Sequence, residues 1–299
     1  MISAPRRLVL AAALAAPAIA RAQQRSVTIV VPFTAGGSTD VLSRLMAERM
    51  TQILGQTVLV ENRPGGNTIV GAEYVARAHA DGNTLLMAAG TTLSINPVVV
   101  RNLPYKVEDF APITLATTYP FGIVTQNNGP ADIPALIAAA KAKPGEITYG
   151  TNGPTTLTNV AMLLVTERLG IRMQDVTYRG DSAALNDFIA GNLDTLVVAG
   201  STAVPVFRNG QGRLIGWTSL QRMPTTPEVP AVAEFAPGTE ALSWFGLLAP
   251  ARTPPAQVQR LHDVAIESLK DPRIQERLTR DAQFVVGSTP EEFTQFLRD

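Results

Sequence analysis

The sequence predicts an α/β protein built on parallel sheets, and three observations carry that prediction. Short apolar, β-branched stretches alternate with longer segments of helical periodicity, which is the pattern of repeated βαβ units. The first unit is a strand over 27–31, followed by Gly36-Gly37 and an amphipathic helix from about Ser38. Turns rich in Ser, Thr and Gly recur between strand and helix at 34–39, 150–156 and 179–182. In open parallel sheets, such turns gather beyond the carboxyl ends of the strands, where ligands bind.

Residues 1–22 are predicted to be a secretory signal peptide outside the fold. Arg6 and Arg7 precede an apolar, alanine-rich run over 8–20, and Ala20-Arg21-Ala22 offers a small-residue cleavage site. The run is too short to span a bilayer comfortably as a retained anchor. We therefore expect a mature chain in the bacterial periplasm, exported by the general or the twin-arginine route. The sequence has no cysteine, which excludes disulfides and a lipoprotein anchor.

The charge of the mature chain argues against polyanionic partners. Of the 25 basic residues, three leave with the signal peptide, so 22 remain against 25 acidic residues. The sequence contains no basic run and no aromatic-interleaved basic stripe. Nucleic acid and anionic membrane surfaces are therefore not expected as partners.

Strands and helices alternate along the first part of the chain. The predicted strands share a short apolar composition and cover 27–31, 57–60 and 84–89. The predicted helices run from 38 to 54 and over 69–78, with turn clusters of Asn, Gly and Pro at 62–67 and 81–83. A small, hydroxyl-rich loop over 90–97 and two extended segments, 113–118 and 121–126, follow.

A second α/β series begins after the loop at 127–130. Its predicted helices cover 132–141, 157–169, 183–190 and 204–208. Its predicted strands cover 147–149, 175–178 and 193–198. A strand over 213–219 could cross back, and a Pro-rich loop follows at 223–230. The remaining predicted elements are a strand at 243–248, helices at 254–269 and 272–280, an extended piece at 283–286 and a helix from Pro290.

The Gly-Gly turn at 36–37 is a candidate anion site. A strand that ends in glycines and enters a helix leaves backbone N–H groups free at a helix terminus where the macrodipole favours negative charge. The alternative is an ordinary turn, in which Ser38 is the N-cap and the Asp40 carboxylate interacts favourably with the helix dipole. The recurrence of such turns favours the anion site.

Six short motifs occur along the chain in a fixed order. They are Pro32-Phe33-Thr34-Ala35-Gly36-Gly37-Ser38-Thr39-Asp40 with Arg44, Val60-Glu61-Asn62-Arg63-Pro64-Gly65, Asp81-Gly82-Asn83-Thr84-Leu85-Leu86, Asp109-Phe110-Ala111-Pro112-Ile113, Tyr178-Arg179-Gly180 and Trp244-Phe245-Gly246-Leu247-Leu248-Ala249-Pro250. With these motifs the mature sequence resembles, over nearly its whole length, the Bug (TctC-like) periplasmic solute receptors of tripartite tricarboxylate transporters.

The resemblance implies a two-domain periplasmic binding protein-like fold of type II, with a mainly parallel sheet in each domain and a ligand cleft between them. By analogy, domain one is 23–123 plus 214–299, and domain two is 124–213. Family members bind small carboxylates through backbone amides, hydroxyls and water. Carried over by position, the implied ligand-binding residues are Phe33, Thr34, Ala35, Gly36, Gly37, Ser38, Thr39, Asp40, Thr91, Thr92, Asn96, Thr151, Gly153, Thr155, Thr156, Arg179, Gly180 and Ser182.

The sequence departs from the family pattern in the second domain. A Gly of the family is replaced by Thr155, which narrows the approach to the loop, and a His is replaced by Asn159. Thr177 stands where the family has Pro. The resemblance therefore implies a carboxylate without naming which one.

No catalytic residue, metal site or cofactor is predicted. Only His79 and His262 are available, and both are interpreted as surface residues on helices. Without Cys, and with so few His, zinc and Cys–His sites are disfavoured. Neither a Gly-x-Ser-x-Gly elbow nor a Walker loop occurs.

Three functions fit these observations. The leading hypothesis is a monomeric transport receptor that encloses a mono- or dicarboxylate and delivers it to membrane permease subunits. A periplasmic sensing adaptor that feeds a signalling partner is the second, and an exported α/β hydrolase is the third. Citrate is expected to fit less well, because Arg179 is the one obvious cation in the predicted loops.

Two charged residues of these loops keep alternative roles. Asp40 either orients its own loop by accepting amide hydrogen bonds or meets a ligand ammonium, and the first role is favoured. Arg179 either grips a ligand carboxylate in bidentate fashion or is a surface residue at a turn.

Overall fold

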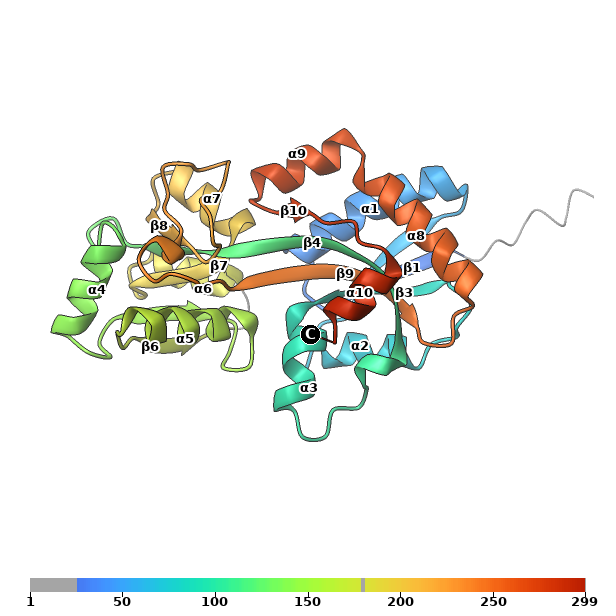
Figure 1. The fold of residues 1–299 in the computed structure, drawn as a ribbon, viewed down its shortest axis with the longest axis horizontal. Coiled ribbons are helices and arrows are strands. Elements are labelled where there is room, and N and C mark those ends of the chain that lie inside the picture. Colours follow the sequence, from blue (N-terminus) through green and yellow to red (C-terminus); the bar gives the residue numbers. More distant parts are fainter. Residues whose placement is uncertain (1–25, 179–180, 299) are drawn as a thin grey trace, which may run out of the picture.

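The structure is a computed structural model that describes residues 26–178 and 181–298. The predicted signal peptide and the turn residues Arg179 and Gly180 lie outside the described residues. Ten strands of the described residues form a continuous sheet. Their order is β2 (Val58–Asn62), β1 (Val27–Val31), β3 (Thr84–Ala89), β9 (Leu242–Pro250), β4 (Phe110–Thr125), β7 (Thr195–Ala199), β5 (Thr148–Thr151) and β6 (Gln174–Thr177), and β8 (Arg213–Trp217) and β10 (Phe284–Val285) also pair with β4. Helices cover this sheet on both faces (Figure 1), and the predicted α/β class is confirmed.

One half of the sheet is built from the two ends of the chain. Parallel strands β1 (Val27–Val31), β2 (Val58–Asn62) and β3 (Thr84–Ala89) lie beside antiparallel β9 (Leu242–Pro250). Helices α1 (Ser38–Leu54), α8 (Pro255–Leu269) and α9 (Pro272–Arg280) pack on one face. Helices α2 (Ile69–Ala76) and α10 (Pro290–Phe296) pack on the other. Because both faces are covered, Ile29 and Val31 enter one core and Val30 the other, which explains the uninterrupted apolar run.

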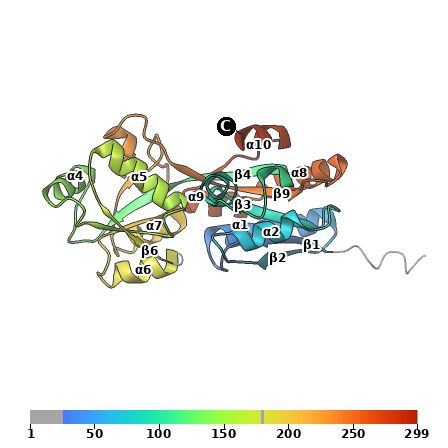
Figure 2. The ribbon, with the colours of Figure 1, turned by 90° about the horizontal axis from the view of Figure 1, so that it is seen from below.

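The other half of the sheet comes from the middle of the chain. Parallel strands β5 (Thr148–Thr151), β6 (Gln174–Thr177) and β7 (Thr195–Ala199) lie beside β4, with β8 (Arg213–Trp217) on the opposite side of β4. Helices α4 (Ile133–Ala142) and α5 (Leu157–Leu169) cover one face, and α6 (Asp181–Ile189) and α7 (Gly200–Arg208) cover the other (Figure 2).

Strand β4 (Phe110–Thr125) runs through both halves, beside β9 for much of its length (Figure 1). The prediction of two extended segments separated near Pro120 is wrong, because one strand covers both. Pro120 falls where the neighbour of β4 changes, between Thr118, which pairs with β10 (Phe284–Val285), and Phe121, which pairs with β7. A residue without an N–H is tolerated at such a junction.

Several predicted boundaries need correction. Residues 91–99 form a π-helical turn (Thr91–Ile95) and α3 (Asn96–Val99), not the predicted loop, because Pro97 falls in the first turn of a helix, where proline is accepted. Helix α7 begins at Gly200 and not at 204, directly after β7. Short 3₁₀ turns cover Val107–Asp109 and Val232–Glu234. Of the other predicted elements, the strands at 27–31 and 84–89 and the helices at 38–54, 157–169 and 272–280 have the predicted ends, and the ends of most others are shifted by a few residues.

Candidate functional site

The loop between β1 and α1 exposes its backbone. Thr34, Ala35, Gly36 and Gly37 are all exposed. Gly36 has φ +89°, a left-handed conformation that strains other residues, whereas Gly37 has φ −77° and is the N-cap of α1. Among the described residues no side chain caps α1, and because the N-cap is Gly37, the interpretation of Ser38 as the N-cap is wrong. The amides at this end remain available for a ligand.

Asp40 organises that loop from inside. Its carboxylate accepts hydrogen bonds from Gly36 N at 2.9 Å, Asn62 Nδ2 at 2.9 Å and Arg44 Nε at 3.0 Å. Asn62 Nδ2 also donates to Phe33 O at 3.2 Å. Burial opposes ionisation of Asp40, but the bonds from Arg44, Gly36 and Asn62 outweigh it and lower its pKa. Of the two roles considered for Asp40, these contacts support the loop-orienting one.

The predicted residues after β3 lie beneath the surface. Thr91 is 8% exposed, and Thr92 and Asn96 are fully buried. Asn96 Nδ2 donates to Asn67 O at 2.8 Å and to Tyr105 OH at 3.3 Å, and Tyr105 OH donates to Thr92 O at 2.7 Å. Burial raises the pKa of Tyr105, which keeps this hydroxyl a donor. These groups therefore hold neighbouring loops together, and their direct contact with a ligand stays a prediction.

In the loop after β5, two of the predicted hydroxyls, those of Thr151 and Thr156, bond to Gly153 of the same loop. Thr151 and Thr156 are buried. Thr151 Oγ1 accepts from Gly153 N at 3.2 Å, and Thr156 Oγ1 donates to Gly153 O at 2.7 Å. Gly153 has φ +124°, again a conformation that favours glycine. Thr155 is only half-buried, so its hydroxyl and carbonyl lie nearer the surface of the loop.

A second carboxylate, Asp175 of β6, ties this loop to its neighbours. It accepts from Thr151 Oγ1 at 2.6 Å, Asn159 Nδ2 at 3.1 Å and Thr177 Oγ1 at 3.3 Å. Within the described residues, Asn159 Oδ1 is a buried acceptor without a partner. Asp175 and Asn159 thus shape the second-half loop, although neither belongs to the predicted set.

The start of α6 is joined to the same loop. Asn152 Nδ2 donates to Asp181 Oδ1 at 2.7 Å, and burial raises the pKa of Asp181. Ser182, which follows, is exposed. Arg179 and Gly180 lie outside the described residues, so their predicted roles stay predictions.

The two halves meet at these loops. Ser38 Oγ, in the first turn of α1, hydrogen-bonds Ser201 Oγ, in the first turn of α7. Asn67 Nδ2, just before α2, donates to Thr155 Oγ1 at 3.2 Å. A Cβ placed on Gly90 would lie 2.2 Å from Leu157 Cδ1 at the start of α5. The structure therefore brings the start of α1 to the start of α7, and the start of α2 to the start of α5, across the two halves.

Ser201 and Asn67 were missed as site residues. Ser201 follows Gly200 directly after β7, so a fourth strand-Gly-helix turn was present in the sequence. Asn67 follows two glycines in a predicted turn cluster, a position where a left-handed residue is favoured. Nothing local in the sequence indicates its contact with a residue 88 positions away.

The electrostatics of this junction favour an anion. Helices α5 and α7 carry no acidic residue in their first turns. Helix α1 carries Asp40, but Arg44 Nη2 lies 2.9 Å from its Oδ1 and compensates that charge. The positive ends of α1 and α7 therefore lie close together, while Asp181 in the first turn of α6 and the carbonyl of Asp281 beside Gly200 are further acidic and acceptor groups described near them.

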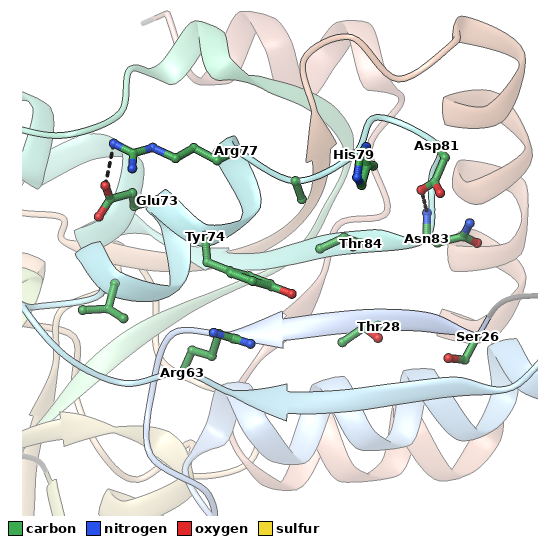
Figure 3. A pocket seen from close by; sticks show the side chains of 12 residues that line it. Ser26, Thr28, Arg63, Glu73, Tyr74, Arg77, His79, Asp81, Asn83 and Thr84 are labelled. Atoms are coloured by element: carbon green, nitrogen blue, oxygen red, sulfur yellow. Dashed lines mark hydrogen bonds and ion pairs between the residues drawn. The ribbon is translucent and has the colours of Figure 1, made fainter.

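A separate hollow of about 870 Å³ lies on the first half of the molecule (Figure 3). Its walls include the start of β1, α2 and the segment after α2, with Arg63 stacked 3.6 Å from the Tyr74 ring centroid and Arg77 paired with Glu73 at 2.7 Å. It lies at the amino ends of β1 and β3, opposite to the edge where α/β sheets bind ligands. We therefore place the candidate site at the junction.

The two histidines do not lie at the junction. His79 follows the end of α2 and lines the outer hollow (Figure 3). His262 of α8 was expected on a solvated face, but it is half-buried and its Nδ1 lies 3.0 Å from Ile113 O. Among the described residues no group of three or more metal-ligand side chains is gathered, and no helix there is long and apolar enough to cross a membrane.

Two α/β halves joined by long strands, with strand-to-helix loops meeting between them, define a two-domain solute-binding architecture. The comparisons agree. A sequence model described as the tripartite tricarboxylate transporter family receptor, TctC, matches residues 42–299. A UPF0065 protein encoded between tcbD and tcbE in Pseudomonas sp. strain P51 is 35% identical over 271 residues, covering 89% of this chain and 80% of the relative. Protein BugT of Bordetella pertussis is 30% identical over 279 residues, covering 92% and 86%.

Two solved structures from Rhodopseudomonas palustris share the whole architecture. Rpa4515 with adipate superposes with a TM-score of 0.87 at 28% identity, covering 92% of this chain and 93% of that one. MatC with bound malate superposes with a TM-score of 0.83 at 28% identity, covering 92% and 96%. The chain therefore belongs to the TctC, or Bug, family of periplasmic solute-binding receptors, and the predicted resemblance is confirmed.

Proposed function

We propose that this protein is a periplasmic receptor that captures a small mono- or dicarboxylate at the junction between its two halves. The observation that carries the proposal is the contact between Ser38 and Ser201, which sets the N-termini of α1 and α7 against each other. A carboxylate at that point meets two positive helix ends and the exposed loop at 34–37, in which the amide of Gly36 is already bonded to Asp40.

The relatives support the ligand class. Two of the similar solved structures are complexes, one with adipate and one with bound malate, both dicarboxylates. Charge-assisted hydrogen bonds contribute about 1.5–3 kcal/mol each, less the cost of ordering the halves. Several of them fit a micromolar receptor, with a binding free energy of about −8 kcal/mol. We expect citrate to bind more weakly, because the described residues at the junction offer helix dipoles and amides but no cationic side chains free to balance its three negative charges.

The remaining parts of the proposal rest on the family. By analogy with the family the lobes are 23–123 plus 214–299 and 124–213, with β4 crossing between them. Because β8 pairs with β4 at Gly122–Thr125 and its Leu214 and Trp217 pack with Phe188, we assign β8 to the second lobe as well. The mature monomer works in the periplasm and hands its ligand to the permease subunits of a tripartite transporter. A binding receptor is also the class to which the family belongs.

Titration calorimetry on the mature chain tests the proposal. The panel holds acetate, malate, adipate, an aromatic acid, citrate and a neutral sugar at matched ionic strength. We expect at least one mono- or dicarboxylate to bind with a micromolar Kd and citrate to bind more weakly. Binding of the sugar with no response to any carboxylate contradicts the proposal.

A further inference from the structure

The side chain of Asn67, in the loop before α2, forms hydrogen bonds to a residue of the opposite half. Its side-chain amide donates to Thr155 Oγ1 at 3.2 Å and to Thr155 O at 3.3 Å. The same amide donates to Asn96 Oδ1 at 3.2 Å. Thr155 belongs to the loop after β5, so these bonds join loops that the sheet itself does not connect.

The backbone around Asn67 is held in an unusual conformation. Four consecutive residues have positive φ: Gly65 at 134°, Gly66 at 56°, Asn67 at 54° and Thr68 at 76°. A left-handed conformation is rare for a β-branched residue, and Thr68 is buried. Strain of this kind persists only where the surroundings over-determine it, and it concentrates at ligand clamps and switch regions.

The surroundings that hold Asn67 are buried and fully bonded. Asn96 Nδ2 donates to Asn67 O at 2.8 Å and to Thr68 Oγ1 at 3.3 Å. Asn96 itself is fully buried and also bonds to Tyr105 OH. The amide of Asn67 is therefore aimed from a rigid base toward a loop that belongs to the other half.

We propose that Asn67 is a positioning residue that clasps the two halves together and so sets how long a ligand stays enclosed. The residence-time part rests on the proposed function, whereas the clasp itself is independent of any ligand. Since the Asn67–Thr155 bonds exist only while the halves are together, breaking them favours the open form and speeds ligand escape. Association, which starts from the open form, changes little.

The test uses variants that separate the amide from the backbone. Asn67→Gly removes the amide but tolerates the left-handed φ, and Asn67→Asp keeps the size but replaces the donor. Thr155→Val removes one of the two acceptors on Thr155. Asn127→Gly is the matched control, because Asn127 Nδ2 donates to Gly210 O at 2.7 Å within one half.

Small-angle scattering of the ligand-free variants measures the clasp directly. We expect a larger radius of gyration for Asn67→Gly and Asn67→Asp, an intermediate value for Thr155→Val, and the wild-type value for Asn127→Gly. In the double variant of Asn67→Gly with Thr155→Val, no expansion beyond Asn67→Gly is expected. Folded Asn67→Gly with the wild-type radius overturns the proposal, whether or not any carboxylate binds.

Stopped-flow kinetics with adipate then measure residence. We expect Asn67→Gly to dissociate about fivefold faster, the equivalent of one ordinary hydrogen bond, with an association rate within about twofold of wild type. An unchanged dissociation rate overturns the residence-time part. If adipate and the other carboxylates do not bind wild type, the proposed function fails while the scattering result still decides the clasp.

Discussion

The loops after β1 and after β5 occupy equivalent places in their halves, yet they use their polar groups differently. Each follows a parallel strand, contains a glycine with positive φ and enters a long helix. Each is also held by one carboxylate, Asp40 in the first half and Asp175 in the second. Asp40 is paired with Arg44, whereas the described partners of Asp175 are three neutral donors.

Because of this difference, the first loop exposes its backbone, whereas the second loop uses its polar side chains to hold its own conformation. In the first loop the charged pair holds Gly36 N from within and leaves the stretch at 34–37 exposed. In the second loop the hydroxyls of Thr151 and Thr156 both bond to Gly153, and that of Thr151 also donates to Asp175 of β6. Loops of similar composition therefore leave their backbone exposed in one half and bond to themselves and to β6 in the other.

Breaking the Asp40 pair is expected to have the largest effect on stability. Asp40→Asn leaves Arg44 without its counter-charge and weakens the bonds to Gly36 and Asn62, so the free energy of unfolding should fall by about 2 kcal/mol at neutral pH. Urea denaturation monitored by circular dichroism measures it. A loss below about 0.5 kcal/mol means that the pair does not organise the loop.

The same variant has a defined pH dependence. Because folding lowers the pKa of Asp40 below its ordinary value of 3.8, its contribution is complete at neutral pH. That contribution is lost as the pH falls from the unfolded-state pKa through the folded-state pKa. The stability gap between wild type and Asp40→Asn should therefore narrow below about pH 4. A gap that stays constant to pH 2.5 rules out the ionised carboxylate as its source.

Asp175→Asn sharpens the comparison, with a smaller expected loss of about 1 kcal/mol. An amide oxygen still accepts one of the three bonds, and no described cation loses its partner. The same urea experiment ranks the two variants. If Asp175→Asn loses more unfolding free energy than Asp40→Asn, the ion pair of Asp40 with Arg44 is not the stronger of the two loop anchors.

Gly36 and Gly37 should differ, although the sequence alone treats them as a pair. Alanine at Gly36 must adopt φ +89°, which costs about 1 kcal/mol or more. Alanine at Gly37 keeps an ordinary φ and approaches only Thr34 O, at 3.9 Å. Thermal unfolding should therefore separate Gly36→Ala from a nearly neutral Gly37→Ala. Equal losses at the two positions are inconsistent with the described loop.

His79→Ala should have the smallest effect. His79 is exposed and lines the outer hollow away from the junction. Both stability, within about 0.5 kcal/mol, and carboxylate affinity should match wild type. A clear loss of affinity in calorimetry moves the binding site to that hollow.

Much of the fold could be predicted because apolar β-branched runs mark buried strands and Gly, Pro and Asn mark their turns. The start of α7 was missed, because Gly200, Ser201 and Thr202 have weak helix propensity. The single strand β4 was missed because Pro120 looked like a break. The burial of Asn96 depends on contacts with Asn67 and Tyr105, which only the tertiary structure brings together. The loops were thus predictable from composition, but the direction of each polar group was not.

The central claim is that an anion is held where the N-termini of α1 and α7 face each other, and Ser201→Asp tests it most directly. This change fixes a carboxylate at the start of α7 beside Ser38, and Ser201→Asn places a neutral group of the same shape there. Calorimetry with the carboxylate that binds wild type most tightly should show affinity reduced about a hundredfold or more by Ser201→Asp. Ser201→Asn should retain most of the affinity. Equal binding by the Asp and Asn variants would contradict the account.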